Sequence, residues 1–339
     1  MSLRWGVLGA ARILRKVVPA LRAAGGRVVV IGASGPERAR AAAAEWDIPH
    51  AADDYQSVLD DPQVDAIYLP LANSLHHPWL LAAAAAGKHC LCEKPLTVTA
   101  AEAREARDAF GRAGRRLMEA FMWCHHPQAA RVRELMRPGE LGEPRRFHAT
   151  FSFPLDRPDD YRWKRAMGGG ALLDIGCYGV SAARYFLGAE PAAVSARGIF
   201  RPGPDGVDES AAAWLDFGEG RVATVSCSFA SAFSQGLEVT GSEGRARLDR
   251  PWLSADVPVR IDIERGFERR TEEVAPADAY RLMAEHFGRL AADPRLPAAP
   301  GEDGTAQADV LGALLASARA GGAVIDLPRT GTRPPAPGE

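Results

Sequence analysis

Two kinds of segment alternate along the first third of the chain. Short, nearly continuous apolar runs such as 28–33 predict strands that are buried on both faces. Each is followed by a longer run in which apolar residues recur at helical spacing. The expected strands are 4–10, 27–33, 64–71, 88–95 and 115–121, and the expected helices are 12–24, 36–45, 74–86 and 99–113. This alternation indicates a parallel sheet covered by helices.

The pattern changes beyond about residue 125. A helix is expected at 127–137, a strand near 145–154, and a further helix over 170–187. Six strand-like segments follow, at 192–200, 210–217, 221–229, 235–241, 244–250 and 257–263. Their short connections predict an antiparallel sheet. Helices are expected again at 277–291 and 305–320.

The two patterns predict two domains, which suits a chain of 339 residues because domains cluster at roughly 100–200 residues. The expected fold class is α/β. Residues 1–124 form a Rossmann dinucleotide-binding domain with a parallel sheet. Residues 125–327 form an α+β domain with a largely antiparallel open sheet, for substrate binding and oligomerisation. The proline-rich end, 328–339, is expected to be a flexible tail.

Composition and charge exclude several classes of protein. The formal net charge of -2 implies no nucleic-acid partner, and no apolar run approaches the ~20 residues that cross a membrane. The first residues lead directly into a strand pattern without the features of a signal peptide, so a cytoplasmic protein is expected. Five scattered cysteines make no disulfide framework, and their spacing with histidines lacks the paired ligands of a zinc site, so no metal is expected.

The first strand runs through a glycine turn into a helix, a context in which a pyrophosphate binds at the helix N-terminus. If Gly9 is the first glycine of a G-x-G-x-x-G motif, Ala11 and Leu14 occupy the second and third glycine positions. The motif is therefore imperfect, and a simple strand-to-helix turn is the alternative. The cofactor-binding residues expected here are Gly9, Ala10, Ala11, Arg12 and Ile13.

The second strand ends without the acidic residue that an NAD site places on the ribose hydroxyls. Ser34 and Arg38 follow it and are candidates to bind the 2′-phosphate of NADP. Arg38 could equally be a solvated helix residue. The sequence thus favours NADP and leaves NAD open.

Further polar residues follow the next strands, where ligands bind at the edge of such sheets. Leu71, Asn73, His76 and Glu93 are expected to line the cofactor site, and Lys94 to serve both cofactor binding and catalysis. A polar residue at a helix N-terminus is the alternative for His76, and a surface lysine for Lys94. Only four lysines occur in the chain, so a lysine in a candidate site is informative.

The expected helix over 170–187 begins with three glycines and carries Asp174 and Tyr178. Residues four apart share a helix face, so these two form a polar patch on an otherwise apolar stripe. A packed tyrosine with a satisfied hydroxyl is the alternative. Trp163, with Arg162 and Lys164, precedes the glycines and could clamp nicotinamide or substrate, or could belong to a solvated loop.

Together these segments make the whole chain resemble the glucose-fructose oxidoreductase, inositol dehydrogenase and MocA family. The resemblance lies in segments 6–13, 70–77, 86–97, 119–128 and 168–178. Tyr178 makes the chain similar to the branch with dimeric dihydrodiol dehydrogenases, NADP-dependent xylose dehydrogenases and sugar 3-ketoreductases. Cys124 departs from the large or basic residue frequent in these relatives, and Gly35-Pro36 replaces the basic residue that often follows the serine in NADP-dependent members.

The resemblance implies transfer of a hydride between nicotinamide and a secondary alcohol or carbonyl of a sugar, sugar nucleotide or cyclic diol. An ordinary tyrosine has a pKa of about 10, too high for an efficient base near neutrality, and a nearby ammonium lowers it. We therefore hypothesise that Tyr178 is the general acid or base and that Lys94 supplies the charge. Asp174 would bind a substrate hydroxyl or orient Lys94. The family also implies a homodimer or homotetramer through the open sheet.

Two other functions remain open at the level of the sequence. A Rossmann protein can bind a dinucleotide as a sensor without turnover. An NAD-dependent glycoside hydrolase is the second alternative. The set Lys94, Asp174 and Tyr178 argues against the first, and the Tyr178 segment argues against the second.

Overall fold

A computed structural model describes residues 2–203, 206–252, 257–293, 295–296 and 304–328. The chain forms two compact units: Met1–His125 with Asp278–Thr305, and His126–Ala277 with Ala306–Glu339. The segment from Asp278 to Thr305 thus lies with the first unit, whereas the sequence pattern assigns it to the second domain. Residues 329–339 of the expected tail lie outside the described residues.

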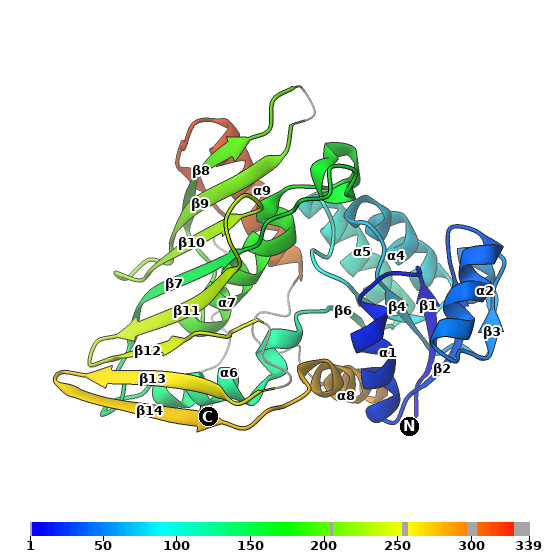
Figure 1. Ribbon diagram of the computed structural model, residues 1–339, viewed down its shortest axis with the longest axis horizontal. Coiled ribbons are helices and arrows are strands. Elements are labelled where there is room, and N and C mark those ends of the chain that lie inside the picture. Colours follow the sequence, from blue (N-terminus) through cyan, green and yellow to red (C-terminus); the bar gives the residue numbers. More distant parts are fainter. Residues whose placement is uncertain (1, 204–205, 253–256, 294, 297–303, 329–339) are drawn as a thin grey trace. The chain divides into compact units, whose positions relative to one another are not determined.

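The first unit is built on six parallel strands in the order β3-β2-β1-β4-β5-β6 (Figure 1). The strands are β1 Arg4–Leu8, β2 Arg27–Gly32, β3 His50–Ala51, β4 Ala66–Leu69, β5 His89–Cys92 and β6 Leu117–Glu119. The helices are α1 Leu14–Ala23, α2 Pro36–Glu45, α3 Tyr55–Asp60, α4 His76–Ala85 and α5 Ala100–Ala113. This strand order confirms the predicted Rossmann fold, with its switch point between β1 and β4.

Local chemistry explains where these helices begin. Thr99 accepts from the amide of Glu102 and the Glu102 carboxylate accepts from the amide of Thr99, which is a complete capping box for α5. Gly114 ends the same helix with a left-handed φ of 62°. Pro36 stands in the first turn of α2, as its position after Ser34 and Gly35 predicts.

Helix α8, Ala279–Ala292, completes the first unit. It packs against α1, and the ring of Phe287 lies 5.3 Å from that of Trp5 in β1. The guanidinium of Arg116 adds hydrogen bonds to the carbonyls of Leu290 and Asp293. A helix from the last fifth of the sequence therefore covers the core formed by the first strand.

The second unit contains nine strands in the order β14-β13-β12-β11-β7-β10-β9-β8-β15. They are β7 Pro144–Ser152, β8 Ala193–Phe200, β9 Asp208–Asp216, β10 Val222–Ser228, β11 Ser234–Gly241, β12 Arg245–Leu248, β13 Val259–Arg265, β14 Glu268–Val274 and β15 Ile325–Asp326. Among the described residues of this sheet, only β7 and β10 pair in parallel, which confirms a largely antiparallel sheet. The helices are α6 Pro127–Leu135, α7 Cys177–Leu187 and α9 Gly304–Arg319, of which Gly304 and Thr305 belong to the first unit.

Helix α7 lies against β7 and β10 of this sheet (Figure 1). Gly179 allows the close approach, because a Cβ there would stand 2.6 Å from Val225 Cγ1. Along β9, buried Ala211, Ala213 and Leu215 alternate with exposed Ala212 and Trp214. The sheet therefore presents one apolar face to α7 and leaves side chains exposed on the other.

The predicted helix over 170–187 differs from a regular α-helix at its start. Leu172–Gly176 form a π-helical turn, and α7 begins only at Cys177. The carboxylate of Asp208, from the first residue of β9, accepts from the amide of Leu172 at 2.6 Å. Gly170 has a φ of 118°, and a Cβ there would stand 2.2 Å from Asp208 Oδ1. A buried carboxylate and an obligatory glycine thus fix the start of the segment.

No helix in the described part of the chain is long and apolar enough to span a membrane. All five cysteines are free thiols, as predicted. Cys90, Cys92, Cys177 and Cys227 are buried, and Cys124 is partly exposed.

The pH dependence of stability should reveal the buried state of Asp208. Burial raises the pKa of its carboxyl to about 6, although the Leu172 amide and Arg319 oppose the shift. Between about pH 4 and pH 6 the unfolded chain ionises this group first, so the free energy of unfolding falls as pH rises. Relative to Asp208→Asn, the wild type should lose about 2 to 3 kcal/mol across that range in urea denaturation. The exposed control Asp262→Asn should show the same pH dependence of the free energy of unfolding as the wild type. Parallel curves for Asp208→Asn and the wild type would contradict the raised pKa of Asp208.

Candidate active site

The turn after β1 requires glycine at its first position. Gly9 has a φ of 125°, and its amide donates to the carbonyl of Gly32 at 2.8 Å. A Cβ at this residue would lie 2.9 Å from Leu71 Cδ2, so Leu71 packs directly over the turn. The two predicted residues, Gly9 and Leu71, are therefore brought together at the switch-point edge of the sheet.

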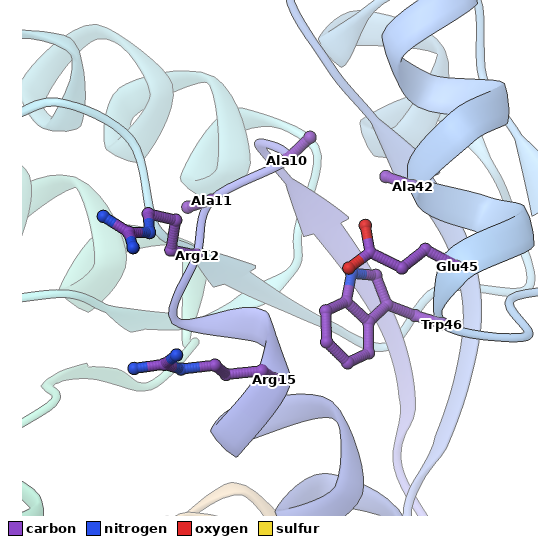
Figure 2. Close-up of a pocket in the computed structure, with 7 residues that line it drawn as sticks. All are labelled: Ala10, Ala11, Arg12, Arg15, Ala42, Glu45 and Trp46. Carbon is purple, nitrogen blue, oxygen red and sulfur yellow. The ribbon is translucent and has the colours of Figure 1, made fainter.

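A pocket of about 290 Å³ adjoins this turn. It is lined by Ala10, Ala11, Arg12, Arg15, Ala42, Glu45 and Trp46. Figure 2 shows the indole of Trp46 between α1 and α2, with the side chains of Arg12 and Arg15 extending away from it. Ile13 stands at the N-cap position of α1. The sequence predicted the first three lining residues. It missed the other four, which lie on α1 and at the C-terminal end of α2, where no motif marks them: Arg15, Ala42, Glu45 and Trp46.

Ser34 and Arg38 meet at the end of β2. Nη1 of Arg38 donates to Oγ of Ser34 at 2.8 Å, one helical turn away along the start of α2. Both side chains are exposed. The pair offers a hydroxyl and a guanidinium at the position where an NAD site has a carboxylate.

His76 is fully buried, between the segment after β4 and the segment after β5. Its Nδ1 lies 2.9 Å from the carbonyl oxygen of Pro95, and its Nε2 lies 3.0 Å from that of Leu71. Burial lowers its pKa, although these carbonyls act in the opposite direction. Since both ring nitrogens face the protein, His76 links Leu71 to the neighbour of Lys94. Asn73, at the start of the short helix Asn73–Leu75, is also buried.

Lys94 is the second residue after β5, which lies next to the switch-point strand β4. The preceding residue, Glu93, accepts from the hydroxyl of Tyr68 at 2.7 Å. Two positions later, the amide of Leu96 donates to Oε1 of buried Glu119 at 2.9 Å. Both sides of Lys94 are thus anchored to neighbouring strands by groups that the sequence did not single out.

Tyr280, from α8, is a further titratable group near Lys94. Burial and the charge of Glu93 raise the pKa of its hydroxyl, while the ammonium of Lys94 lowers it. No sequence pattern predicted that Tyr280 lies near Lys94, because the two residues are about 190 positions apart.

In the second unit, Asp174 lies in the π-helical turn and is only 3% exposed. Nε of Arg162 donates to its Oδ2 at 2.7 Å. Burial opposes the charge on Arg162, but Asp174, Tyr161 and Asp160 together outweigh that cost, so the pKa of Arg162 is raised. Asp160 holds the same guanidinium at 3.2 Å. Arg162 therefore neutralises Asp174, a role that the sequence left open.

Tyr178 lies one turn further along, on α7, and is 8% exposed. Its ring meets Phe151 edge-on at a centroid distance of 5.4 Å and Trp252 at 5.6 Å. Trp252 is fixed in turn, because its Nε1 donates to the carbonyl of Thr150 at 3.2 Å. Aromatic contacts therefore hold the phenol ring in one orientation.

Trp163 lies in the second unit, outside the dinucleotide-binding fold to which most of the predicted cofactor residues belong. The guanidinium of Arg201 stacks over its ring at 4.3 Å, and Phe229 meets the ring edge-on at 5.3 Å. The indole is thereby oriented by its own unit, with a cation on one face.

Two family descriptions match this chain. Residues 3–121 match the oxidoreductase family with an NAD-binding Rossmann fold, and residues 129–247 match the GFO/IDH/MocA C-terminal domain. The sequence is 36% identical over 324 residues to D-xylose 1-dehydrogenase (NADP(+)) 2 of Haloferax volcanii, across 94% of this chain and 98% of the relative. It is 37% identical over 265 residues to a dTDP-3,4-didehydro-2,6-dideoxy-alpha-D-glucose 3-reductase of Saccharopolyspora spinosa, across 77% and 79%.

The fold is similar to that of KijD10, a 3-ketoreductase from Actinomadura kijaniata solved with NADP and TDP-benzene. The TM-score is 0.87 at 31% identity, over 95% of this chain and 98% of the other. These findings confirm the resemblance inferred from the sequence motifs. The chain belongs to the GFO/IDH/MocA oxidoreductase family and is an NAD(P)-dependent oxidoreductase.

Proposed function

We propose that the enzyme is NADP-dependent and transfers a hydride to or from a secondary alcohol or carbonyl carbon of a sugar or sugar nucleotide. The observation that carries this proposal is the position of Lys94 two residues after β5, one strand from the switch point whose glycine turn suits a pyrophosphate. Relatives named for D-xylose and for a dTDP-linked keto-sugar support the substrate class. A cyclic diol is the third candidate, since a mouse trans-1,2-dihydrobenzene-1,2-diol dehydrogenase is 33% identical over 76% of the chain.

The residues around the glycine turn fit a dinucleotide. The positive φ of Gly9 and the small side chains of Ala10 and Ala11 would let phosphates approach the backbone before α1. Ser34 and Arg38 would bind a 2′-phosphate through a hydroxyl and a charge-assisted hydrogen bond. When bound, the nicotinamide supplies the hydride chemistry, and the protein must orient the substrate and move one proton.

Arg38→Ala should weaken the use of NADP more than the use of NAD. Loss of a charge-assisted hydrogen bond should raise KM for NADP by about 10- to 100-fold and leave KM for NAD nearly unchanged. Steady-state kinetics with each cofactor measures the ratio. Arg40→Ala, an exposed arginine on the same helix, serves as the matched control and should alter neither value. Equal effects on the two cofactors would remove Arg38 from 2′-phosphate recognition.

The proton step is assigned to Tyr178. Its Oη would donate a proton to the substrate oxygen in reduction and accept one in oxidation, while the ammonium of Lys94 favours the phenolate. Asp174 would accept a hydrogen bond from a substrate hydroxyl, with Arg162 keeping it ionised. The packing of Phe151 and Trp252 supports this role, because it fixes the direction in which the phenol points.

Tyr178→Phe should lower kcat by about 10²–10⁴-fold while NADP binding stays near normal, since only the proton-carrying oxygen is removed. Turnover is followed by NADPH absorbance across a panel of aldoses, sugar nucleotides and diols, and binding by fluorescence titration. Tyr185→Phe on the same helix, at the same 8% exposure, is the matched control and should keep wild-type turnover. Wild-type activity in Tyr178→Phe would exclude this tyrosine from the chemistry.

We also propose that the exposed face of the second sheet joins two copies of the chain. Trp214 on β9 is 38% exposed on this face, between its register partners Ser195 and Thr224. Thr224 in turn pairs with His148 on β7, and Nδ1 of His148 lies 2.9 Å from Oγ1 of Thr224. An exposed tryptophan whose two direct cross-strand partners are small and uncharged favours a protein contact over solvent.

Trp214→Arg should shift the molar mass in solution from a dimer or tetramer to the monomer, because a charge would be buried without a partner. Size-exclusion chromatography with light scattering measures the mass. Phe267→Ser, at the fully exposed β13–β14 turn, is the control and should keep the wild-type mass. A wild-type monomer would refute the interface.

A further inference from the structure

Cys177 directly follows the π-helical turn that carries Asp174, and its backbone carbonyl accepts a hydrogen bond from a side chain distant in sequence. Nε2 of Gln307, on α9, donates to the carbonyl oxygen of Cys177 at 2.8 Å. Gln307 is 1% exposed, and Cys177 is the residue immediately before Tyr178. A side chain 130 positions away in sequence therefore contacts the backbone where the π turn gives way to α7.

The orientation of this amide is set by a buried ion pair. Nη1 of Arg184 donates to Oε1 of Gln307 at 3.0 Å, which leaves only the NH₂ group to face Cys177. Glu190 holds the same guanidinium through two hydrogen bonds, at 2.6 and 2.8 Å. The chain Glu190–Arg184–Gln307–Cys177 is thus directional, with a donor fixed toward the carbonyl.

The opposite end of the π turn is held independently. Asp208 accepts from the amide of Leu172, and Gly170 leaves room for its carboxylate. A π turn contains one residue more than an α turn. The positions of its two ends therefore set how the residues within it and after it are rotated about the helix axis. Asp208 and Gln307 fix these two ends from β9 and α9.

We propose that Gln307 is a positioning residue, which holds the Cys177 carbonyl so that Tyr178 keeps the rotation required for proton transfer. This inference rests on the proposed role of Tyr178. Gln307 acts through the backbone, because Cys177, whose carbonyl it binds, lies between Asp174 and Tyr178 in the sequence. Loss of its hydrogen bond should let the π turn relax toward a regular α-helix and rotate Asp174 relative to Tyr178.

Gln307→Glu tests this role selectively. The variant keeps an acceptor for Arg184 but replaces the donor that faces the Cys177 carbonyl with an oxygen. We expect kcat to fall by about 10-fold with KM for NADP unchanged, since small displacements of reacting groups are costly. Gln307→Met, which is neutral and similar in length, provides a second variant if the glutamate prevents folding. Ser317→Ala is the matched control on α9, because Ser317 is fully buried and its hydroxyl bonds, in the described structure, to the amide of Ala196 in β8 and to the carbonyl of Ala323.

Two further measurements separate this inference from the proposed function. Hydrogen exchange of amides 172–178 in the ligand-free protein should accelerate at least several-fold in the Gln307 variants and stay unchanged in Ser317→Ala. In a Tyr178→Phe background, Gln307→Glu should lower the residual kcat less than twofold.

Each outcome has one meaning. Faster exchange with full activity of Tyr178→Phe would refute the catalytic role of Tyr178 and retain Gln307 as the group that holds the turn. Unchanged exchange, or a kcat for Gln307→Glu equal to that of Ser317→Ala, would overturn the positioning role. A full 10-fold loss in the Tyr178→Phe background would also overturn it, because Gln307 would then act on something other than Tyr178.

Discussion

The second unit depends on satisfying the backbone of one irregular turn away from water. A buried N–H or C=O without a partner is costly, and a π-helical turn departs from the regular bonding of the helix that it enters. Here a carboxylate accepts from the amide of Leu172, and an amide donates to the carbonyl of Cys177. The irregular geometry is thereby made stable, and the polar residue Asp174 is held inside an apolar segment.

In the first unit, hydrogen bonds from buried side chains likewise hold the backbone around Lys94. Three side chains from different strands and segments tie down its neighbours: Tyr68 at Glu93, His76 at Pro95 and Glu119 at Leu96. None of these groups needs to contact a substrate. In both units, then, buried polar residues fix the backbone beside a candidate catalytic residue.

Local patterns predicted the elements and the residues with obvious chemistry. The buried run of β2, the proline at the start of α2 and the Asp174–Tyr178 spacing all act within one element, so the sequence alone reveals them. The sequence did not predict the bond between Leu172 and Asp208 at the π turn, the Gln307 contact or the link from His76 to Pro95. Each joins residues far apart in sequence through a hydrogen bond, and neither hydrophobic periodicity nor turn chemistry records such pairings.

The membership of α8 in the first unit has a consequence for how the protein is made. Phe287 and Met283 are fully buried, and Phe287 packs against Trp5, which stands in the first strand. A ribosome must therefore synthesise almost the whole polypeptide before the earliest strand acquires its cover, and the intervening second unit emerges in the meantime. A fragment that stops after the last Rossmann strand would leave Trp5 without that cover, so the nucleotide-binding half cannot be cut out as one continuous piece.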